Sequence, residues 1–139
     1  MDCYVWSCGN MSFDFKKYYD VGTHLKNHSS AEEYQRSSIS RYYYSVFHPL
    51  KDYYEKSFRR VLSSQDSHKT LIEELESSPF KEEKILGEKM RNLRNNRNYA
   101  DYNKKELRKI KVRDSKDKAD EILSQLNYLI KHPLRMMKK

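Results

Sequence analysis

The chain has 139 residues, the length of one domain, and its 28 Lys and Arg residues against 20 Asp and Glu residues give a formal net charge of +8. No apolar run approaches the roughly 20 residues that span a bilayer. The N-terminus shows no basic segment followed by an apolar stretch, so neither membrane insertion nor secretion is expected. We therefore predict a cytoplasmic protein with reduced thiols, whose basic surface favours partners that carry phosphate.

The remaining composition predicts helices around a thin core. The chain has only three Gly and three Pro residues, so turns are few. Its 12 tyrosines supplement the aliphatic residues, because each buries a large ring while keeping a polar tip. A core of this kind would gain from a partner or from a second copy of the chain.

The first helix is predicted over residues 13–27, after a flexible extension over residues 1–11. Its apolar side chains fall at roughly helical spacing: Phe13, Tyr18, Val21 and Leu25. Gly22 weakens this prediction. The next helix is expected to begin near Ser30, because Ser30 and Glu33 match a capping box that satisfies the first free amides of a helix.

The second helix carries the longest apolar stripe of the chain. Its members recur at three- and four-residue steps: Ile39, Tyr42, Tyr43, Val46, Phe47, Leu50, Tyr53, Tyr54 and Phe58. Pro49 lies within the stripe and should kink the helix, since it removes an amide donor and crowds the carbonyl of Ser45. This is the clearest helix in the sequence.

The second half of the chain predicts a short helix over residues 69–76 and a longer one over residues 81–101. Residues 104–118 hold eight basic side chains against three acidic ones, which is typical of a linker or an exposed basic arm. A final helix, capped by Asp114 or Ser115, is expected to end before Pro133. Its predicted inward stripe is Ala119, Ile122, Leu123, Leu126, Leu129 and Ile130. In the helix predicted over residues 81–101, the inward residues are Leu86, Met90, Leu93 and Ala100.

The predicted architecture is therefore an all-α antiparallel bundle of four to five helices over residues 12–131. A basic tail over residues 132–139 follows, and its last residues, "RMMKK", are expected to fray. Neither internal repeats nor alternating strand patterns are present.

The segment "NLRNNRNYADY" (92–102) places several polar side chains on one arc of its helix, beside the inward stripe. These are Arg94, Arg97, Asn98 and Asp101. Two guanidiniums and an amide offer converging donors that suit a phosphodiester. The alternative is an Arg97–Asp101 ion pair on a solvated surface, worth only tenths of a kcal/mol. The spacing alone leaves both open.

Other side chains have a functional and a structural interpretation. Cys3, Cys8, His24 and His28 resemble the ligand spacing of a classical zinc finger. However, the residues of a finger's small core are missing, which favours cysteines and histidines without metal. The tyrosines near Tyr42 and the basic run at 104–118 are candidates to contact nucleobases and phosphates, with core packing and a solvated loop as the alternatives.

Two motifs resemble those of a known family. "SRYYYSVFH" (40–48) is similar to a Ser-Arg-x-Tyr-Tyr-x-x-Phe-His pattern in the second helix of HEPN-domain proteins. "RNYADY" (97–102) resembles the Arg-x-x-Ala-Asp-Tyr ending of the fourth helix in a bacterial and archaeal branch of that family, and "SHK" (67–69) also fits that branch. The resemblance covers about residues 12 to 131.

The resemblance implies a helical bundle that forms a homodimer, with an arginine-containing motif of each subunit in a shared cleft. Many HEPN proteins are metal-independent endoribonucleases that act as toxins in toxin–antitoxin, abortive-infection or CRISPR-linked defence systems. Their motif joins an arginine and a polar residue to a histidine four to six positions later. Arg94 and Asn95 match its beginning, whereas Ala100 fills the histidine position and cannot transfer a proton, so Asp101 or His48 would have to substitute.

The candidate catalytic residues are therefore Arg94, Asn95 and Asp101. The candidate residues for binding RNA or another ligand are Arg97, Asn98, Tyr102, Arg41, His48, Lys104, Lys105 and Arg108. Tyr102 also matches the tyrosine that is adenylylated in the toxin branch partnered by a small nucleotidyltransferase, so such an antitoxin is an expected partner. No metal or other cofactor is expected.

Two functions compete at this point. The first is an RNA-directed endoribonuclease toxin of a toxin–antitoxin or phage-defence module, supported by Arg94 and Asn95. The second is a catalytically inactive HEPN module that binds RNA, a nucleotide or a protein partner through its dimer cleft. Ala100 favours the second, because the family's usual mechanism needs an ionisable group at that position.

Overall fold

Helix α2 (Glu32–Phe58) is the central element of the structure, a computed structural model that describes residues 13–63 and 65–135. A 3-10 turn, η1 (Phe15–Lys17), and α1 (Tyr18–His28) precede it. The helices α3 (Ser67–Glu76), α4 (Lys81–Tyr102) and α5 (Lys109–Lys131) follow it. The described residues therefore form a packed bundle of five α-helices without a strand, which confirms the predicted all-α class.

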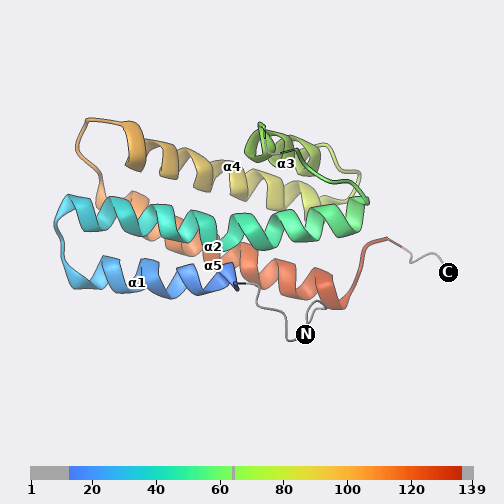
Figure 1. Cartoon of the computed structure of the whole chain (residues 1–139), viewed down its shortest axis with the longest axis horizontal. Helices are drawn as coiled ribbons and strands as arrows, with labels where there is room; N and C mark the ends of the chain where they lie inside the picture. Colours follow the sequence, from blue (N-terminus) through green and yellow to red (C-terminus); the bar gives the residue numbers. More distant parts are fainter. Residues whose placement is uncertain (1–12, 64, 136–139) are drawn as a thin grey trace.

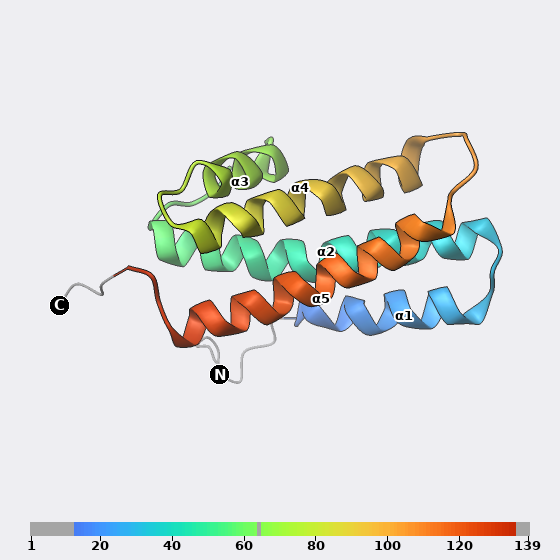
Figure 2. The same ribbon diagram turned by 180° about the vertical axis from the view of Figure 1, so that it is seen from behind.

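Helix α2 lies at the centre because its apolar stripe is wide enough to contact several neighbours. Ile39, Tyr42, Val46 and Leu50 are fully buried, and of the predicted stripe only Phe58 stays partly exposed. Helices α1, α4 and α5 all pack against α2 (Figure 1). The reverse view shows α5 running across the back of the bundle, between α1 and α4 (Figure 2). Pro49 lies inside α2, and the helix continues through it without interruption.

Two predicted helix caps were wrong. The N-cap of α2 is Ala31 rather than Ser30, and the Ser29 hydroxyl accepts a hydrogen bond from the Ala31 amide at 3.0 Å. The capping box predicted from Ser30 and Glu33 is therefore not formed. Helix α5 begins at Lys109, five residues before the predicted cap, because Val112 and Ser115 are buried and draw the basic segment into the bundle.

The predicted burial also needs three corrections. Phe13 and Val21, assigned to the inward stripe of the first helix, are 51% and 40% exposed, and Ile130 of α5 is 65% exposed. In α1 only Gly22 is fully buried, Tyr18, Tyr19 and Leu25 are half-buried, and Val21 is exposed. Arg135, expected to fray with the C-terminal tail, instead donates two hydrogen bonds to the buried carboxylate of Glu83 at 2.6 and 2.9 Å.

The C-terminal end of α4 is held by Arg36 of α2. Its guanidinium donates hydrogen bonds to the carbonyl oxygens of Ala100 at 3.0 Å, Asn103 at 2.6 Å and Lys105 at 2.5 Å. Carbonyls in the last turn of a helix have no partner within the helix, so one arginine satisfies groups that would otherwise need water. This contact fixes the end of α4, where the "RNYADY" motif lies.

Helix α3 packs closely on α4 because Gly87 has no side chain. A Cβ atom at this position would lie 2.8 Å from Glu76 Cγ and 2.9 Å from the Glu76 backbone nitrogen. The backbone of α3 cannot retreat without moving the whole helix. This close approach sets where α3, and therefore His68 near its start, lies relative to α4.

We expect Gly87→Ala to lower the free energy of unfolding by about 1–3 kcal/mol, because overpacking at a backbone contact outweighs the roughly 1 kcal/mol that alanine gains within a helix. Urea denaturation followed by circular dichroism measures the change. Glu88→Ala, at an exposed position of the same helix, is the matched control. An unchanged or raised stability of Gly87→Ala would show that α3 adjusts at no cost.

No helix within residues 13–63 and 65–135 is long and apolar enough to cross a membrane.

Candidate functional site

Arg97 of α4 lies among three tyrosine rings. Its guanidinium carbon is 5.3 Å from the ring centre of Tyr43, 5.5 Å from that of Tyr44 and 6.0 Å from that of Tyr102. Its Nε donates a hydrogen bond to Asp101 at 3.0 Å, and only 13% of its side chain is exposed. Burial lowers the pKa of Arg97, but the hydrogen bond to Asp101 and the charge interactions with Tyr44, Asp101 and Tyr43 together outweigh it, and the net pKa is raised. Arg97 is thus a fixed cation rather than part of a solvated ion pair.

His68, the second residue of α3, joins this cluster from another direction. Its ring stacks on Phe47 at 3.8 Å with an interplanar angle of 10°, and its Nδ1 lies 2.5 Å from the Tyr43 hydroxyl. The same Tyr43 and Tyr44 rings that contact Arg97 lie 5.6 and 6.0 Å from the His68 ring. An imidazole and an arginine from different helices are therefore held on a shared aromatic support.

Burial and the charges of two arginines keep His68 neutral. Burial, followed by the positive charges of Arg97 and Arg94, lowers the pKa of His68 to about 4. Burial also raises the pKa of Tyr43 well above its usual range, although the two arginines oppose that shift. At pH 7 the cluster thus contains two guanidiniums, a neutral imidazole and a neutral phenol. The cations and the burial that keep this imidazole neutral also make it a weak base, and an anion bound between the arginines would offset their charge and strengthen it as a proton acceptor.

Arg94 is the member of the cluster with unused donor capacity. Among the residues that the structure describes, its Nε is the one buried side-chain nitrogen or oxygen atom without a hydrogen-bond partner. A buried N–H group left unpaired costs free energy, so such atoms are rare in folded proteins. An anion that accepts a hydrogen bond from this Nε would remove that cost once the side chain turned the buried atom outward.

The other predicted residues of the "NLRNNRNYADY" segment divide into two groups. Asp101 orients Arg97, and Tyr102, which is 74% exposed, has its ring at the edge of the cluster. Asn95 is exposed, Asn98 is half-buried, and neither makes any of the contacts that hold the cluster together. Their predicted roles rest on the sequence alone.

Arg41 and His48 lie at the side of the cluster that faces η1 and α1. The Arg41 guanidinium is 4.8 Å from the ring centre of Tyr18, and His48 stacks on Phe15 at 3.7 Å. Burial and the charge of Lys51 lower the pKa of His48. A phenylalanine covers one face of each imidazole, Phe15 for His48 and Phe47 for His68, but it is His68 that lies at hydrogen-bond distance from the Tyr43 hydroxyl.

Lys104, Lys105 and Arg108 lie in the connection between α4 and α5, at the end of the bundle (Figure 1). All three side chains are exposed. The Lys105 amide donates to Asn103 Oδ1 at 2.8 Å, so the connection is ordered by local contacts. These cations form an edge of positive charge separate from the cluster around Arg97.

Ala100, which fills the histidine position of the resembled motif, is only 3% exposed. It packs in a small apolar group with Ile39, Leu107 and Val112. A proton-transferring side chain at position 100 would therefore lie inside the bundle rather than in the cluster. The imidazole whose pKa the two arginines lower is that of His68. In the sequence, His68 stood out only as part of the "SHK" segment, which gives no information about its neighbours in the fold.

The structure does not test the zinc alternative predicted from the sequence. Cys3 and Cys8 lie outside the described residues. His24 and His28 lie one turn apart, with ring centres 5.8 Å from each other. Over residues 13–63 and 65–135, no group of three or more His, Cys, Asp or Glu side chains could hold a metal ion.

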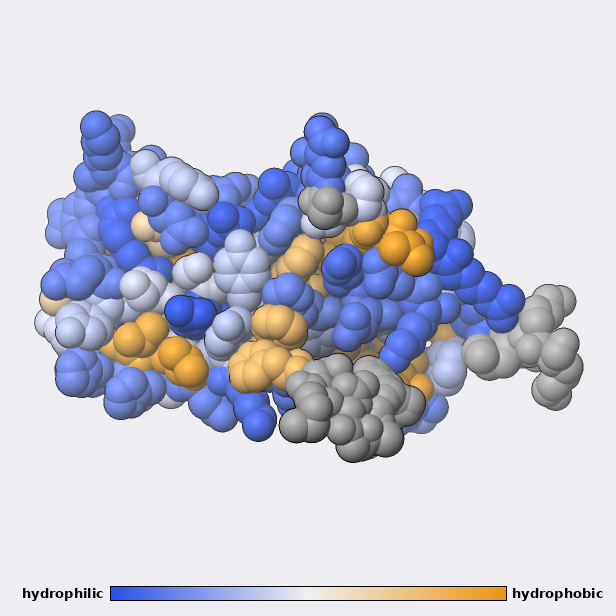
Figure 3. Space-filling view, viewed as in Figure 1, coloured by the Kyte–Doolittle hydropathy of each residue, from blue (hydrophilic) through white to orange (hydrophobic). Residues whose placement is uncertain are grey.

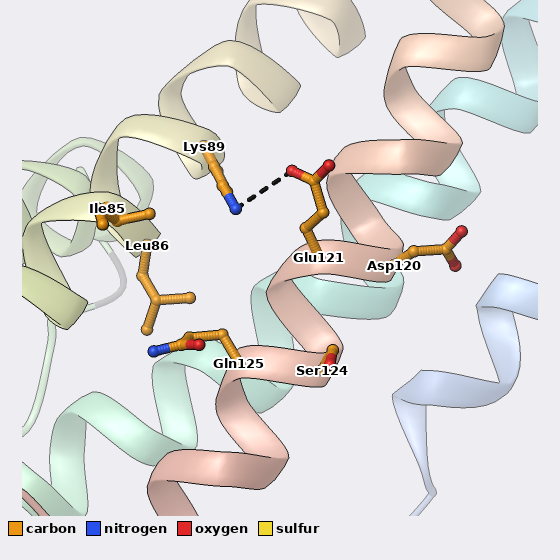
Figure 4. A pocket seen from close by; sticks show the side chains of 7 residues that line it. All are labelled: Ile85, Leu86, Lys89, Asp120, Glu121, Ser124 and Gln125. Atoms are coloured by element: carbon orange, nitrogen blue, oxygen red, sulfur yellow. Dashed lines mark ion pairs between the residues drawn. The ribbon is translucent and has the colours of Figure 1, made fainter.

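A groove of about 510 Å³ lies between α4 and α5 (Figure 4). An ion pair between Lys89 and Glu121 crosses it at 3.2 Å, and Leu86 and Gln125 form part of its wall. Lys89 and Arg94 are five residues apart and so point about 140° away from each other around α4. The groove therefore contains none of the predicted site residues.

No protein-family model, no curated protein and no solved structure matches the chain. Its function is therefore argued from its residues and their geometry.

Proposed function

We propose that this protein is a HEPN-like, RNA-directed, metal-independent endoribonuclease in which His68 takes the place of the family's usual histidine. The observation that carries the proposal is the cluster itself: a neutral imidazole on α3 shares the Tyr43 and Tyr44 rings with Arg97, and the charges of Arg94 and Arg97 both act on it. Cleavage of RNA through its 2′-hydroxyl needs a proton acceptor and a cation at the phosphorus centre.

In this mechanism the Arg94 side chain turns outward and its guanidinium binds a non-bridging oxygen of the scissile phosphate, which satisfies the Nε that is otherwise buried without a partner. The tautomer of His68 that donates from Nδ1–H to the Tyr43 oxygen leaves a lone pair on Nε2. That lone pair accepts the proton of the 2′-hydroxyl while the 2′-oxygen attacks phosphorus. The bond to the 5′-oxygen then breaks, the leaving oxygen takes a proton from water, and a 2′,3′-cyclic phosphate remains. The hydroxide left by that water takes the proton from His68, so the imidazole is neutral again.

The biological setting follows from the resemblance in the "SRYYYSVFH" and "RNYADY" segments. By that resemblance the protein would form a homodimer with a shared cleft and act as a toxin within a toxin–antitoxin or phage-defence module. A small nucleotidyltransferase encoded next to this chain would support that setting. The thin, tyrosine-rich core and the exposed apolar side chains of Phe13 and Val21 are consistent with a second copy.

The test is incubation of the purified protein with labelled tRNA or mRNA in the presence of EDTA. We expect fragments with 2′,3′-cyclic ends, which Arg94→Ala abolishes, because the phosphate then loses its cation. Arg113→Ala, which removes the same charge from an exposed position of α5, should leave cleavage unchanged. Cleavage that survives Arg94→Ala, or that needs a divalent cation, would refute the mechanism.

The second candidate is binding without cleavage, which the burial of Ala100 favours. In that case the cluster holds an RNA phosphate or a nucleotide, and affinity falls steeply with salt while no cut appears.

A further inference from the structure

A strip of aromatic rings leads away from the Arg94–Arg97–His68 cluster over the surface of η1 and α2. We name Phe13, Phe15, His48 and Tyr44 the ring strip. Consecutive ring centres lie 5.0 Å apart for Phe13 and Phe15, 3.7 Å for Phe15 and His48, and 6.1 Å for His48 and Tyr44. Tyr44 then lies 6.0 Å from His68, so the strip is continuous with the cluster.

The ring strip is not part of the core. Phe13 is 51% exposed, and the other three rings are only partly buried. Figure 3 shows residues of low polarity gathered over the middle and lower part of this face, where α1 and α2 run, between hydrophilic areas. Large apolar rings at the surface of a basic protein are unusual unless they meet a ligand.

Two arginines lie near the ring strip, one beside the rings that neighbour Phe13 and Phe15 and one at Tyr44. The Arg41 guanidinium lies 4.8 Å from the ring centre of Tyr18, which itself contacts Phe13 at 5.4 Å and Phe15 at 5.7 Å. Arg97 lies 5.5 Å from the ring centre of Tyr44 at the other end. Exposed rings beside fixed positive charges form the kind of surface that binds the bases and phosphates of a single nucleic-acid strand.

We propose that the ring strip binds unpaired nucleobases, so that the substrate is single-stranded RNA with its scissile phosphate at Arg94. This inference rests on the proposed function for the place of the phosphate, and it adds which form of RNA is selected. A duplex hides the faces of its bases in the stack, so it can offer only its backbone to the cations. The strip then discriminates between single strands and duplexes.

The test is fluorescence anisotropy with three fluorescein-labelled probes: a short oligouridine, an RNA duplex of equal length, and an oligomer of abasic sugar-phosphates. We expect the wild-type protein to prefer oligouridine. Phe15→Leu and Phe13→Ser should each weaken oligouridine binding about tenfold and leave abasic binding unchanged, because only the stacking contact is lost. Phe13 is exposed, so its variant keeps the fold. Tyr128→Leu, at an exposed tyrosine of α5, is the matched control.

Three results would overturn the inference. The first is equal affinity for duplex and oligouridine. The second is an equal loss of abasic and oligouridine binding in both variants, which would mean that the rings act only through the fold. The third is unchanged RNA affinity with an altered sedimentation coefficient, which would assign the ring strip to a protein contact. Because the readout is binding, absence of cleavage would refute the proposed enzyme without deciding the role of the ring strip.

Discussion

Replacing His68 by glutamine is expected to lower the rate of RNA cleavage by about 10²–10⁴-fold while changing RNA affinity little, because the amide cannot accept a proton. Glutamine still fills much of the space beside Phe47 and keeps a group that can hydrogen-bond to the Tyr43 hydroxyl. Single-turnover cleavage of labelled RNA measures the rate, and anisotropy with the same RNA measures binding.

The matched control is His48→Gln, since His48 lies beside the cluster but stacks against Phe15. It should retain cleavage within about tenfold, well short of the loss from removing a proton-transfer group. Tyr43→Phe keeps the buried ring and removes only the hydroxyl that orients His68, so an intermediate loss is expected. If His48→Gln is inactive and His68→Gln is not, the proton acceptor has been assigned to the wrong histidine.

The pH dependence separates a catalytic His68 from a structural one. Since the pKa of His68 is lowered to about 4, the neutral base is fully formed at pH values where an ordinary histidine is still half protonated. The acidic limb of kcat/KM, which reports the free enzyme, should therefore fall near pH 4 rather than near pH 6.5. Bound phosphate offsets the charges of Arg94 and Arg97, so the limb of kcat should lie at higher pH.

The helices of the bundle could be predicted from the sequence because their apolar residues recur at helical spacing. The stripe of α2 recurs at three- and four-residue steps, and a residue that repeats in this way must face the same side of the helix. The grouping of Arg97 with Asp101 follows from the same geometry, since they lie one turn apart on α4. What the spacing left open was whether this pair was solvated, and the answer came from Tyr43 and Tyr44 on another helix.

The role of His68 could not be predicted, because it depends on how α3 packs against α2 and α4. Nothing in the segment "SHK" indicates that Phe47 lies beneath the imidazole or that Tyr43 meets its Nδ1. The early start of α5 was missed for a related reason: local composition marks residues 109–113 as a basic arm, but Val112 is buried by contacts with distant residues. Local sequence patterns predict single helices, whereas contacts between side chains of different helices become known only from the folded structure.

Glu83 is the clearest case of a pairing between elements. It is fully buried in α4, a place where a carboxylate is costly unless it is satisfied. The Tyr53 hydroxyl donates to it at 2.5 Å, the Ser78 hydroxyl at 2.6 Å, and Arg135 donates to both of its oxygens. Arg135 also lies 4.2 Å from the ring centre of Phe58. One carboxylate thus joins α2, the α3–α4 connection and the residues after α5.

We expect Glu83→Gln to lower the free energy of unfolding by about 3–5 kcal/mol, because it breaks a buried ion pair and leaves Arg135, Tyr53 and Ser78 short of acceptors. Glu88→Gln, exposed on the same helix, is the control and should change stability by less than about 0.5 kcal/mol. Urea denaturation at pH 7 measures both. A loss below about 1 kcal/mol for Glu83→Gln would show that water satisfies the freed donors.

The same carboxylate should make stability depend on pH. Burial raises the pKa of Glu83, but the hydrogen bonds from Arg135, Ser78 and Tyr53 outweigh it and hold the pKa below its ordinary value of 4.5. A carboxylate with a lowered pKa in the folded state stabilises the fold above its unfolded pKa, and this contribution is lost as the pH falls through the folded value. The stability difference between wild type and Glu83→Gln should therefore be constant above about pH 5 and shrink on further acidification. A difference that persists unchanged to pH 2 would mean that the charge of Glu83 contributes nothing, and that its stabilising effect comes from shape and neutral hydrogen bonds alone.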